Sequence, residues 1–327
     1  MGCLKRGISF YSYLYEYYQG LMKLEDCFSE AAAAGITGVE LLADYMLPGY
    51  PGLEEGFVRH WYELLEKYHM EPVCLDLFNG VNPIGNVPLP DEEHIRSLIS
   101  DLHIAARLGF PCVRITAMTS LKVVEAVLPA ARQLNVKLGY EIHPPLSMDS
   151  PWFEEKLAFI REKQTDFVGF IPDMGIFAKY ANPVRKEWFI RKGVRREISD
   201  AIDLAFAKGQ SVETLKTCLE KEGPEALELR YMSEVFRENN ENPDNIVKYK
   251  EYFFHIHGKF YEMDENCRET SLNYEAVLER LAASGYDGYI CSEYEGSRYL
   301  SDLGYVESCE QVRRHHGMLK KFLLQNK

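Results

Sequence analysis

The residues best suited to chemistry in this chain are imidazoles and carboxylates that recur within short apolar runs. The run YFFHIHGKF at 252–260 contains His255 and His257, and two strand residues at this spacing share one face. Three other apolar runs end in donors of the same kinds: Glu141 and His143 in KLGYEIH, Asp173 in FVGFIPD, and Glu293 and Glu295 in YICSEYEG. Such groups, converging from the ends of successive strands, are the ligands that a divalent metal ion needs.

Four of these donors form the predicted metal set. Burying several carboxylates in an apolar site is costly without a counter-charge, which a divalent cation supplies. We therefore assign Glu141, Asp173, His257 and Glu293 as ligands, and we prefer Glu293 to Glu295 as the deeper of the two. Carboxylate oxygens with one imidazole favour Mn²⁺, with Mg²⁺, Co²⁺ and Zn²⁺ as rivals. Taken alone, an aspartate after a strand is more often a helix cap.

Other polar side chains near this set are candidates for catalysis. His143 would stand beside the metal as the general base, with Glu141 and Glu293 as the other candidates for that role. Lys259 is expected on the ligand-bearing face, where its ammonium group would stabilise a developing oxyanion. His255 is expected either to bind the metal as well or to contact a residue that binds it. For His143, Lys259 and His255 the alternative is a polar group satisfied within the core or at the rim.

Four residues are expected to contact a substrate: His255, Glu40, Arg114 and Tyr11. Glu40 and Arg114 come near the ends of the second and fourth strand-like runs, where they would reach a substrate hydroxyl. Tyr11 belongs, with Phe10 and Tyr13, to an aromatic run that would stack on a planar group at the mouth of the site. For Glu40 and Arg114 a purely structural role is the alternative.

Eight strand-like runs alternate with amphipathic helix patterns. The runs span 8–13, 38–43, 72–78, 112–118, 137–143, 168–173, 252–260 and 288–294. Helix patterns between them close at glycines such as Gly35, Gly109 and Gly285, as expected before a short turn. Near-continuous apolar strands alternating with helices predict an α/β fold with parallel strands, and eight such units close a (β/α)8 TIM barrel. Chemistry in this fold lies at the carboxyl ends of the strands, where the donors are found.

One segment interrupts this alternation. Residues 178–245, between the sixth and seventh strands, read as two or three helices, which is much more than one crossover requires. We expect residues 1–327 to form a single TIM-barrel domain with 178–245 as a helical insertion within it. The insertion would be a lid, an interface for a second chain, or a surface elaboration without a catalytic role.

The composition argues against several classes of partner. The chain has 327 residues with 37 basic and 50 acidic side chains, and its net charge of −13 repels nucleic acid and anionic membranes. No apolar stretch approaches the length of a membrane span, and no signal-peptide pattern opens the chain. The eight cysteines include no C-x-x-C pair, as expected for buried thiols in a reducing compartment. We therefore expect a cytoplasmic protein that acts on a small molecule.

These motifs resemble the sugar phosphate isomerase/epimerase superfamily of xylose isomerase-like barrels. The resemblance covers nearly the whole chain apart from the insertion, through GITGVEL, the strand ends EIH and FIPD, HIHGKF at the position of the family's H-x-K strand, and CSEYEG. Residue by residue it implies the same ligands, Glu141, Asp173, His257 and Glu293. Members of this superfamily bind the oxygens of a keto sugar to Mn²⁺ or a similar ion and move a proton on the carbon beside the carbonyl.

Two features depart from the simple 3-epimerases of that superfamily. The long helical insertion is one, and the sequence EIHPP, with His143, Pro144 and Pro145 after the metal glutamate, is the other. Both are similar to the α subunit of bacterial C-glycoside deglycosidases, which cleave the carbon–carbon bond between a 3-oxo sugar and a flavonoid-type aglycone. This resemblance implies a Mn²⁺ requirement and a small β subunit in a hetero-oligomer.

Several functions follow as hypotheses. The leading one is a metal-dependent lyase on 3-oxo-glycosides, in which a base removes the proton beside the keto group and the aglycone is eliminated. A ketose or sugar-phosphate isomerase or 3-epimerase shares the first step, although a phosphate would call for a basic cluster that we do not find. A third hypothesis is a non-catalytic subunit with a structural metal. The abasic-site endonuclease branch of the fold would require more histidine ligands and a basic groove, against the net charge of −13.

Overall fold

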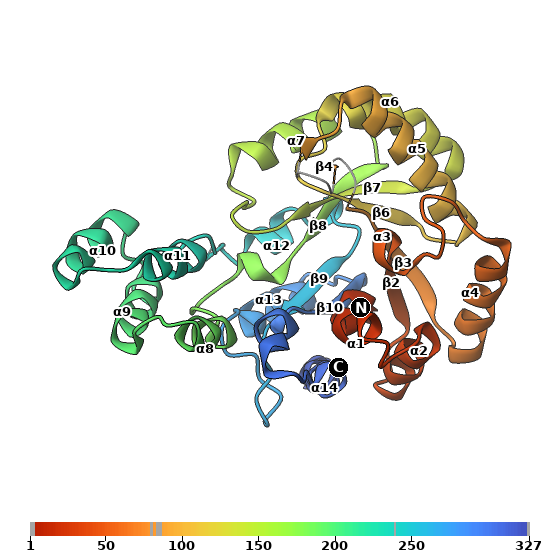
Figure 1. The fold of residues 1–327 in the computed structure, drawn as a ribbon. Helices are drawn as coiled ribbons and strands as arrows, with labels where there is room; N and C mark the ends of the chain where they lie inside the picture. Colours follow the sequence, from red (N-terminus) through yellow and green to blue (C-terminus); the bar gives the residue numbers. More distant parts are fainter. Residues whose placement is uncertain (1–3, 79–80, 83–86, 239, 326–327) are drawn as a thin grey trace.

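The computed structural model describes residues 4–78, 81–82, 87–238 and 240–325. Eight parallel strands form a nearly closed barrel with helices around it, which confirms the predicted TIM barrel (Figure 1). Hydrogen-bonded neighbours follow the order β8-β7-β6-β3-β2-β1-β10-β9. Isolated bridges from Phe170 to Phe253 and from Asp173 to His257 bring the two edge strands, β8 and β9, together.

The barrel strands correspond in order to the eight apolar runs of the sequence. They are β1 (Lys5–Ser9), β2 (Gly38–Leu42), β3 (Glu71–Asp76), β6 (Cys112–Ile115), β7 (Lys137–Ile142), β8 (Val168–Pro172), β9 (Ile256–Phe260) and β10 (Tyr289–Tyr294). Every residue of β2, β8 and β9 is buried, because helices cover the outside of the barrel and side chains fill its interior. The strands therefore hold polar side chains in a largely water-excluded setting.

Helices follow most strands and run back along the outside of the barrel (Figure 1). The longer ones are α2 (Leu24–Ala33), α4 (Glu55–Tyr68), α5 (Asp91–Arg107), α6 (Leu121–Leu134), α7 (Pro151–Lys163), α13 (Tyr274–Ala283) and α14 (Ser308–Gln325). Shorter elements are α1 (Leu14–Tyr18), α3 (Ala43–Met46), β4 (Val81–Asn82), β5 (Val87–Pro88), η5 (Gly296–Tyr299) and η6 (Ser301–Leu303). Gly109 and Gly285, just after α5 and α13, have φ angles of 79° and 70°, which explains the glycine stops. Of the helices described, none has the length and apolar character to cross a membrane.

The first strand lies closer to the amino terminus than the sequence predicts. β1 ends at Ser9, and the aromatic residues that follow form a 3₁₀ turn, η1 (Phe10–Tyr13), in place of the predicted strand 8–13. The hydroxyl oxygen of Ser9 accepts a hydrogen bond from the N–H of Tyr11 at 3.4 Å and so starts the turn. Aromatic residues favour strands, but this local cap outweighs that preference. Tyr11 consequently lies beyond the carboxyl end of the strand.

The segment between β8 and β9 projects from one side of the barrel (Figure 1). Its elements are η2 (Met174–Ile176), α8 (Pro183–Arg191), α9 (Arg196–Ala207), α10 (Val212–Leu219), η3 (Glu220–Glu222), α11 (Ala226–Val235), α12 (Asn245–Lys248) and η4 (Lys250–Tyr252). Helices α8 to α11 share a hydrophobic cluster of their own that includes Phe189, Ile202 and Tyr231. Arg191 ties this projection to the loop after β10, because it pairs with Asp302 at 2.9 Å and donates to the carbonyl of Tyr299 at 2.6 Å.

Candidate metal centre

Four donors that the sequence singles out lie together at the carboxyl ends of the barrel strands. Glu141 lies on β7, Asp173 follows β8, His257 lies on β9 and Glu293 lies on β10. One donor atom from each of them lies within 4.8 Å of the others. These strands are neighbours around the barrel, so the closure between β8 and β9 itself assembles the group. We call these four residues the donor group.

His257 presents its two ring nitrogens to different carboxylates. Its Nδ1 lies 3.0 Å from Oε1 of Glu141 and 3.7 Å from Oε2 of Glu293. Its Nε2 lies 3.1 Å from one oxygen of Glu40, whose other oxygen lies 2.8 Å from Nε2 of His255. A carboxylate behind a ligand imidazole fixes the tautomer and leaves the opposite nitrogen for the metal. Nδ1 is therefore the nitrogen of His257 that faces the carboxylates of Glu141 and Glu293 and would be available to an ion.

Glu40 and His255, which the sequence predicts to contact a substrate, lie deep in the barrel beside His257. Both side chains are fully buried, and they pair with each other behind His257. Burial alone would raise the pKa of Glu40, but the two imidazoles outweigh burial and hold this pKa well below its usual range. Neither residue lines the cavity beside the donor group, so their contacts support His257.

The electrostatics of the donor group fit a divalent cation. Burial, together with Asp173 and Glu141, raises the pKa of Glu293 well above its ordinary value, although His257 opposes the shift. Oε2 of Glu293 is buried and has no hydrogen-bond partner within the described part of the chain. A buried carboxylate oxygen without a hydrogen bond, next to two other carboxylates, is an arrangement that a bound cation stabilises. The residues present therefore suit the predicted ion.

Asp173 caps a turn, as the structural alternative predicts, and it also lies in the donor group. Its Oδ1 accepts a hydrogen bond from the N–H of Gly175 at 2.5 Å, so it caps η2. Its Oδ2 lies 3.4 Å from Nζ of Lys259, and the same carboxylate belongs to the donor group. The cap therefore holds the side chain toward the barrel mouth, where it is fully buried.

His143 lies in contact with Lys259. Nδ1 of His143 lies 2.7 Å from the carbonyl oxygen of Pro144, and since a carbonyl only accepts, Nδ1 carries the proton and donates. Nε2 of His143 lies 2.7 Å from Nζ of Lys259 and accepts from the ammonium group. Burial alone would lower the pKa of Lys259, but Asp173 and Glu295 outweigh it and raise this pKa well above its usual value. The ammonium group therefore stays charged.

A cavity of about 250 Å³ opens beside His143 and Lys259. The barrel contributes one part of its lining: His143, Pro144, Lys259, Tyr261, Glu295, Arg298 and Tyr299. The projecting segment contributes the other part: Arg185, Glu234, Arg237 and Glu238. Glu295 lies 3.0 Å from Nζ of Lys259 and 3.3 Å from Nη1 of Arg298, so it connects the ammonium group to the rim.

Arg114 lies behind the donor group. Its Nε lies 3.8 Å from Oε2 of Glu141 and 3.7 Å from Oδ1 of Asp76. Its Nη1 donates to the carbonyl of Leu77 at 2.8 Å, and its guanidinium group lies over the ring of Phe78. Burial would raise the pKa of Glu141, but Arg114 and His257 hold it well below its usual range. Arg114 thus keeps a predicted ligand ionised.

The aromatic residues near the mouth divide into a buried pair in the core and a set that lines a second cavity. Phe10 and Tyr13 are buried in the hydrophobic core, which corrects the expectation that they stack on a substrate. The reason is the 3₁₀ turn, which directs both rings inward. Tyr11 lines a second cavity of about 240 Å³ together with Tyr15 and Tyr18. Arg298 lines both cavities, so the two are neighbours.

Further donor combinations lie deeper in the barrel. They are Cys74, Cys112 and His255; Glu40, His255 and Cys291; and Glu40, Asp76 and His257. All of these residues are buried, and none of them lines the cavity beside His143. The members of the donor group do not line this cavity either, but Lys259, which does line it, lies 3.4 Å from Oδ2 of Asp173 and so connects the donor group to the cavity.

Some residues that the sequence did not assign to the site contribute to it. Asp76 lies 3.9 Å from Nε2 of His257 and beside Arg114. Arg185 and Glu238 enter the cavity wall from the projecting segment. For Arg185 and Glu238 the one sequence signal was the position of the long insertion directly after the Asp173 strand end.

Two adjacent histidines on α14 share one partner on β10. The hydroxyl oxygen of Ser292 lies 2.6 Å from Nδ1 of His315 and 2.6 Å from Nε2 of His316. Burial lowers the pKa of His315 to about 3 and that of His316 well below its ordinary value. Both imidazoles are therefore neutral, and they fix the strand that carries Glu293.

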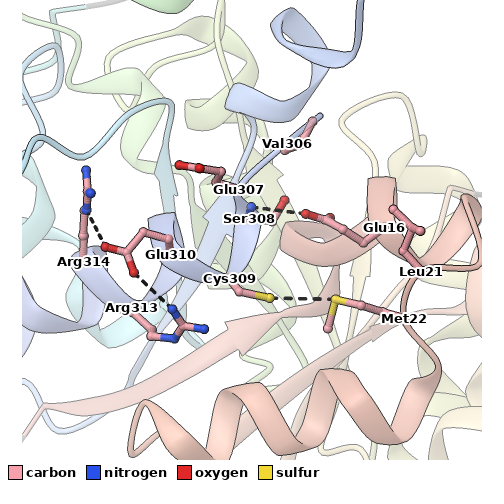
Figure 2. Close-up of a pocket in the computed structure, with 10 residues that line it drawn as sticks. All are labelled: Glu16, Leu21, Met22, Val306, Glu307, Ser308, Cys309, Glu310, Arg313 and Arg314. Carbon is pink, nitrogen blue, oxygen red and sulfur yellow. Dashed lines mark hydrogen bonds and ion pairs between the residues drawn. The ribbon is translucent and has the colours of Figure 1, made fainter. Parts of the chain in front are cut away.

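The more open hollow in Figure 2 lies apart from the donor group and has a volume of about 560 Å³. Three of its charged residues pair with one another, since Glu310 contacts both Arg313 and Arg314. Glu16 accepts a hydrogen bond from the N–H of Ser308 at 3.2 Å (Figure 2). None of the predicted site residues lines this hollow.

Named relatives resemble this chain over most of its length. It is 27% identical to the 3'-dehydrocarminate deglycosidase alpha subunit of Microbacterium sp over 310 residues, which cover 89% of this chain and 88% of that protein. It is 25% identical to a C-glycoside deglycosidase alpha subunit of Arthrobacter globiformis, with 97% and 92% coverage.

Solved structures share the fold at lower identity. The L-ribulose 3-epimerase structure superposes with a TM-score of 0.59 at 12% identity, covering 99% of this chain and 95% of that one. The IolI protein, crystallised with a bound zinc atom, superposes with a TM-score of 0.57 at 14% identity, covering 99% of both chains. The family model described as Xylose isomerase-like TIM barrel matches residues 28–321. The chain therefore belongs to the xylose isomerase-like TIM barrel family.

Proposed function

We propose that this chain is the catalytic α subunit of a metal-dependent C-glycoside deglycosidase, a lyase that acts on 3-oxo-glycosides. The observation that carries the proposal is the pair of His143 and Lys259 at the wall of a cavity beside the donor group. The relatives named as deglycosidase alpha subunits support the class of substrate.

The donor group would hold the metal ion. Glu141, Asp173, His257 and Glu293 offer three carboxylates and one imidazole, which suits Mn²⁺ ahead of Mg²⁺, Co²⁺ or Zn²⁺. When bound, such an ion supplies Lewis-acid polarisation of a keto oxygen. Lys259 has Glu295 as a second partner at 3.0 Å, so it stays paired if Asp173 turns to the ion.

His143 would act as the base. Its Nε2 carries the lone pair, which the ammonium group of Lys259 engages before a substrate is bound. Once that ammonium group turns to the keto oxygen, Nε2 would remove the proton from C2 of the sugar, between the keto carbon and the anomeric carbon. The bond from C1 to the aglycone then breaks, and its electron pair leaves with the aglycone carbon. A double bond forms between C1 and C2, and the protonated His143 returns its proton to the aglycone. Atoms and electrons balance without an oxidant or a reductant.

Lys259 would stabilise the negative charge that this step creates. Its ammonium group is buried and held between Asp173, Glu295 and His143. A preorganised cation in a water-excluded site stabilises a developing oxyanion more than the same cation in water does. Glu141 and Glu293, the other candidates for the base, would be engaged as ligands.

A small β subunit is part of the proposal. The relatives carry the name alpha subunit, which implies a second type of chain in their assemblies.

The cavity of Tyr11, Tyr15 and Tyr18 beside Arg298 would accept a flat aglycone ring. The sugar would then occupy the neighbouring cavity near His143.

The test is a turnover assay with a 3-oxo-C-glucoside, with and without a co-expressed β subunit, EDTA and added Mn²⁺. We expect release of free aglycone that EDTA stops and Mn²⁺ restores. Interconversion of free ketoses with the glycoside left intact would instead favour the isomerase or 3-epimerase alternative. Substitution of His143 and of each ligand without any loss of activity in the assembly would favour a non-catalytic metal-binding subunit.

A further inference from the structure

The projecting helical segment reaches the cavity through two residues that form an ion pair. Arg185 lies in the first turn of α8, where the side chain of Asn182 caps the helix. Glu238 lies three residues after the end of α11. Nη1 of Arg185 lies 2.8 Å from Oε1 of Glu238, and both side chains line the cavity that also contains His143 and Lys259.

The hydrogen-bonding capacity of this pair is only partly used. Arg185 is 4% exposed, and its Nε and Nη2 have no hydrogen-bond partner among the residues described. These two nitrogens form the side edge of the guanidinium group, whose parallel N–H groups bind two acceptor oxygens at once. Oε2 of Glu238 is likewise buried and unpartnered. Leaving such groups without hydrogen bonds costs free energy. A ligand that forms hydrogen bonds with all three atoms would therefore gain free energy of binding.

We propose that Arg185 and Glu238 form a clamp for two hydroxyl groups of the sugar, which makes the projecting segment part of the substrate site. The two N–H groups of Arg185 donate to the two hydroxyl oxygens, and one hydroxyl donates to Oε2 of Glu238. The clamp thus pairs two donors and one acceptor with a ligand that offers the complementary set.

Hydroxyl groups fit this clamp better than a carboxylate does. Glu238 already balances the charge of Arg185, so the pair itself carries no net positive charge for an anion. A carboxylate only accepts hydrogen bonds and would be repelled by Oε2 of Glu238. Hydroxyl groups both donate and accept, and they carry no charge that has to be compensated.

The position of the clamp indicates which hydroxyls it would take, on the basis of the proposed function. C1, C2 and the keto carbon of the sugar would lie near His143 and the donor group. The hydroxyls at C4 and C6 lie on the other side of the ring, away from the bond that breaks. Because the clamp lies on the wall contributed by the projecting segment, we assign it to the hydroxyls at C4 and C6.

The experiment measures the binding of 3-oxo-glucose to the Mn²⁺-loaded protein by calorimetry, and turnover of a 3-oxo-C-glucoside in parallel. Arg185→Lys keeps the positive charge and the ion pair with Glu238 but removes the two parallel N–H donors of the guanidinium group. We expect it to weaken binding of 3-oxo-glucose about 10-fold or more, as loss of a hydrogen bond to a charged group does. Glu238→Gln, which keeps the shape, is expected to weaken binding in the same direction. The 4-deoxy and 6-deoxy analogues should bind the wild type more weakly than 3-oxo-glucose but lose little further affinity for Arg185→Lys.

The matched control is Arg195→Lys. Arg195 also pairs with a glutamate of the same projection, since its Nε and Nη2 donate to the two oxygens of Glu228, but it does not line the cavity. Its variant should bind 3-oxo-glucose as the wild type does. Thermal unfolding and metal content identify any variant that fails to fold.

The outcomes separate this inference from the proposed function. Binding of 3-oxo-glucose that depends on Arg185, without cleavage of the glycoside, would support the clamp and refute the lyase. Unchanged binding in Arg185→Lys and Glu238→Gln would overturn the clamp whatever the turnover. An equal loss in Arg195→Lys would also overturn it, since the effect would then come from the stability of the projection. A wild type that binds no 3-oxo-glucose overturns both.

Discussion

Nζ of Lys259 lies 2.7 Å from Nε2 of His143, although the two residues are 116 positions apart in the chain. Nδ1 of His143 is engaged with the carbonyl of Pro144, so this contact fixes which nitrogen of the imidazole is the acceptor. The proposed base and the cation that would stabilise the charge it creates are thus neighbours before a substrate binds. This arrangement leads to separate predictions for the base, the cation, the ligands and their support.

Replacement of the proposed base should stop catalysis and leave the metal in place. We expect His143→Ala to reduce aglycone release by about 10²–10⁴-fold, the usual contribution of general base catalysis. His143 does not belong to the donor group, so metal content measured by elemental analysis should not change. The exposed His60 on α4 offers a control, since His60→Ala should retain activity. Full activity in His143→Ala would refute its assignment as the base.

Replacement of Lys259 should lower the rate of the chemical step. We expect Lys259→Met to reduce kcat by about 10²–10³-fold, as loss of a preorganised oxyanion contact does. The measurement is single-turnover release of aglycone at saturating substrate, with metal content checked in parallel. Lys179→Met, at an exposed lysine, is the control. An effect of Lys259→Met confined to KM would argue for a binding role instead.

Replacement of Asp173 should remove the metal and with it the activity. Asp173→Ala loses both the predicted ligand and the cap of η2, whereas Asp173→Asn retains an oxygen that can cap the turn. We therefore expect both variants to lose Mn²⁺ and turnover, and Asp173→Asn to unfold at a higher temperature than Asp173→Ala. Dialysis followed by elemental analysis measures the metal. Retention of Mn²⁺ by both variants would show that Asp173 is not a ligand.

Glu40 should control metal affinity without contacting the ion. Its carboxylate lies 3.1 Å from Nε2 of His257, on the side of the ring opposite the donor group. We expect Glu40→Gln to weaken Mn²⁺ binding about 10–100-fold, the usual effect of removing a carboxylate behind a ligand histidine. Titration of the metal-free protein with Mn²⁺ measures the affinity. Unchanged Mn²⁺ affinity together with weaker substrate binding would instead support the substrate-binding role predicted for Glu40.

The buried histidines of α14 should make the fold less stable in acid. The folded pKa of His315 is about 3, below the ordinary value for histidine, because burial disfavours the charged form. Between about pH 6.5 and pH 3 the unfolded chain therefore binds more protons than the folded one. As the pH is lowered through this range, the free energy of unfolding decreases by up to about 1.4 kcal/mol per pH unit for each proton.

Urea unfolding in EDTA, at neutral pH and at about pH 5, measures this effect without a contribution from the metal. We expect the wild type to lose more free energy of unfolding between the two conditions than the double variant His315→Gln, His316→Gln. The Gln side chains retain a hydrogen-bonding group for Ser292 but do not titrate. Equal losses in the two proteins would show that these histidines do not control the acid sensitivity.

The sequence by itself determined the barrel and the identity of the four donors. Both follow from local regularities: apolar runs alternate with helix patterns, and a strand period of two fixes which side chains share a face. The donors stand at strand ends, and a parallel barrel brings strand ends to one rim, so Glu141, Asp173, His257 and Glu293 had to meet. The turn at Ser9 escaped this reasoning because a single side-chain hydrogen bond decides it.

Only the tertiary structure decided how the donors are oriented and what surrounds them. Glu40 lies behind Nε2 of His257, Lys259 contacts His143, and Arg185 enters the cavity from a projection whose docking no local pattern specifies. Each of these contacts joins residues far apart in the chain. Their geometry depends on the closure of the barrel and the packing of side chains across it, which periodicity along one segment does not encode.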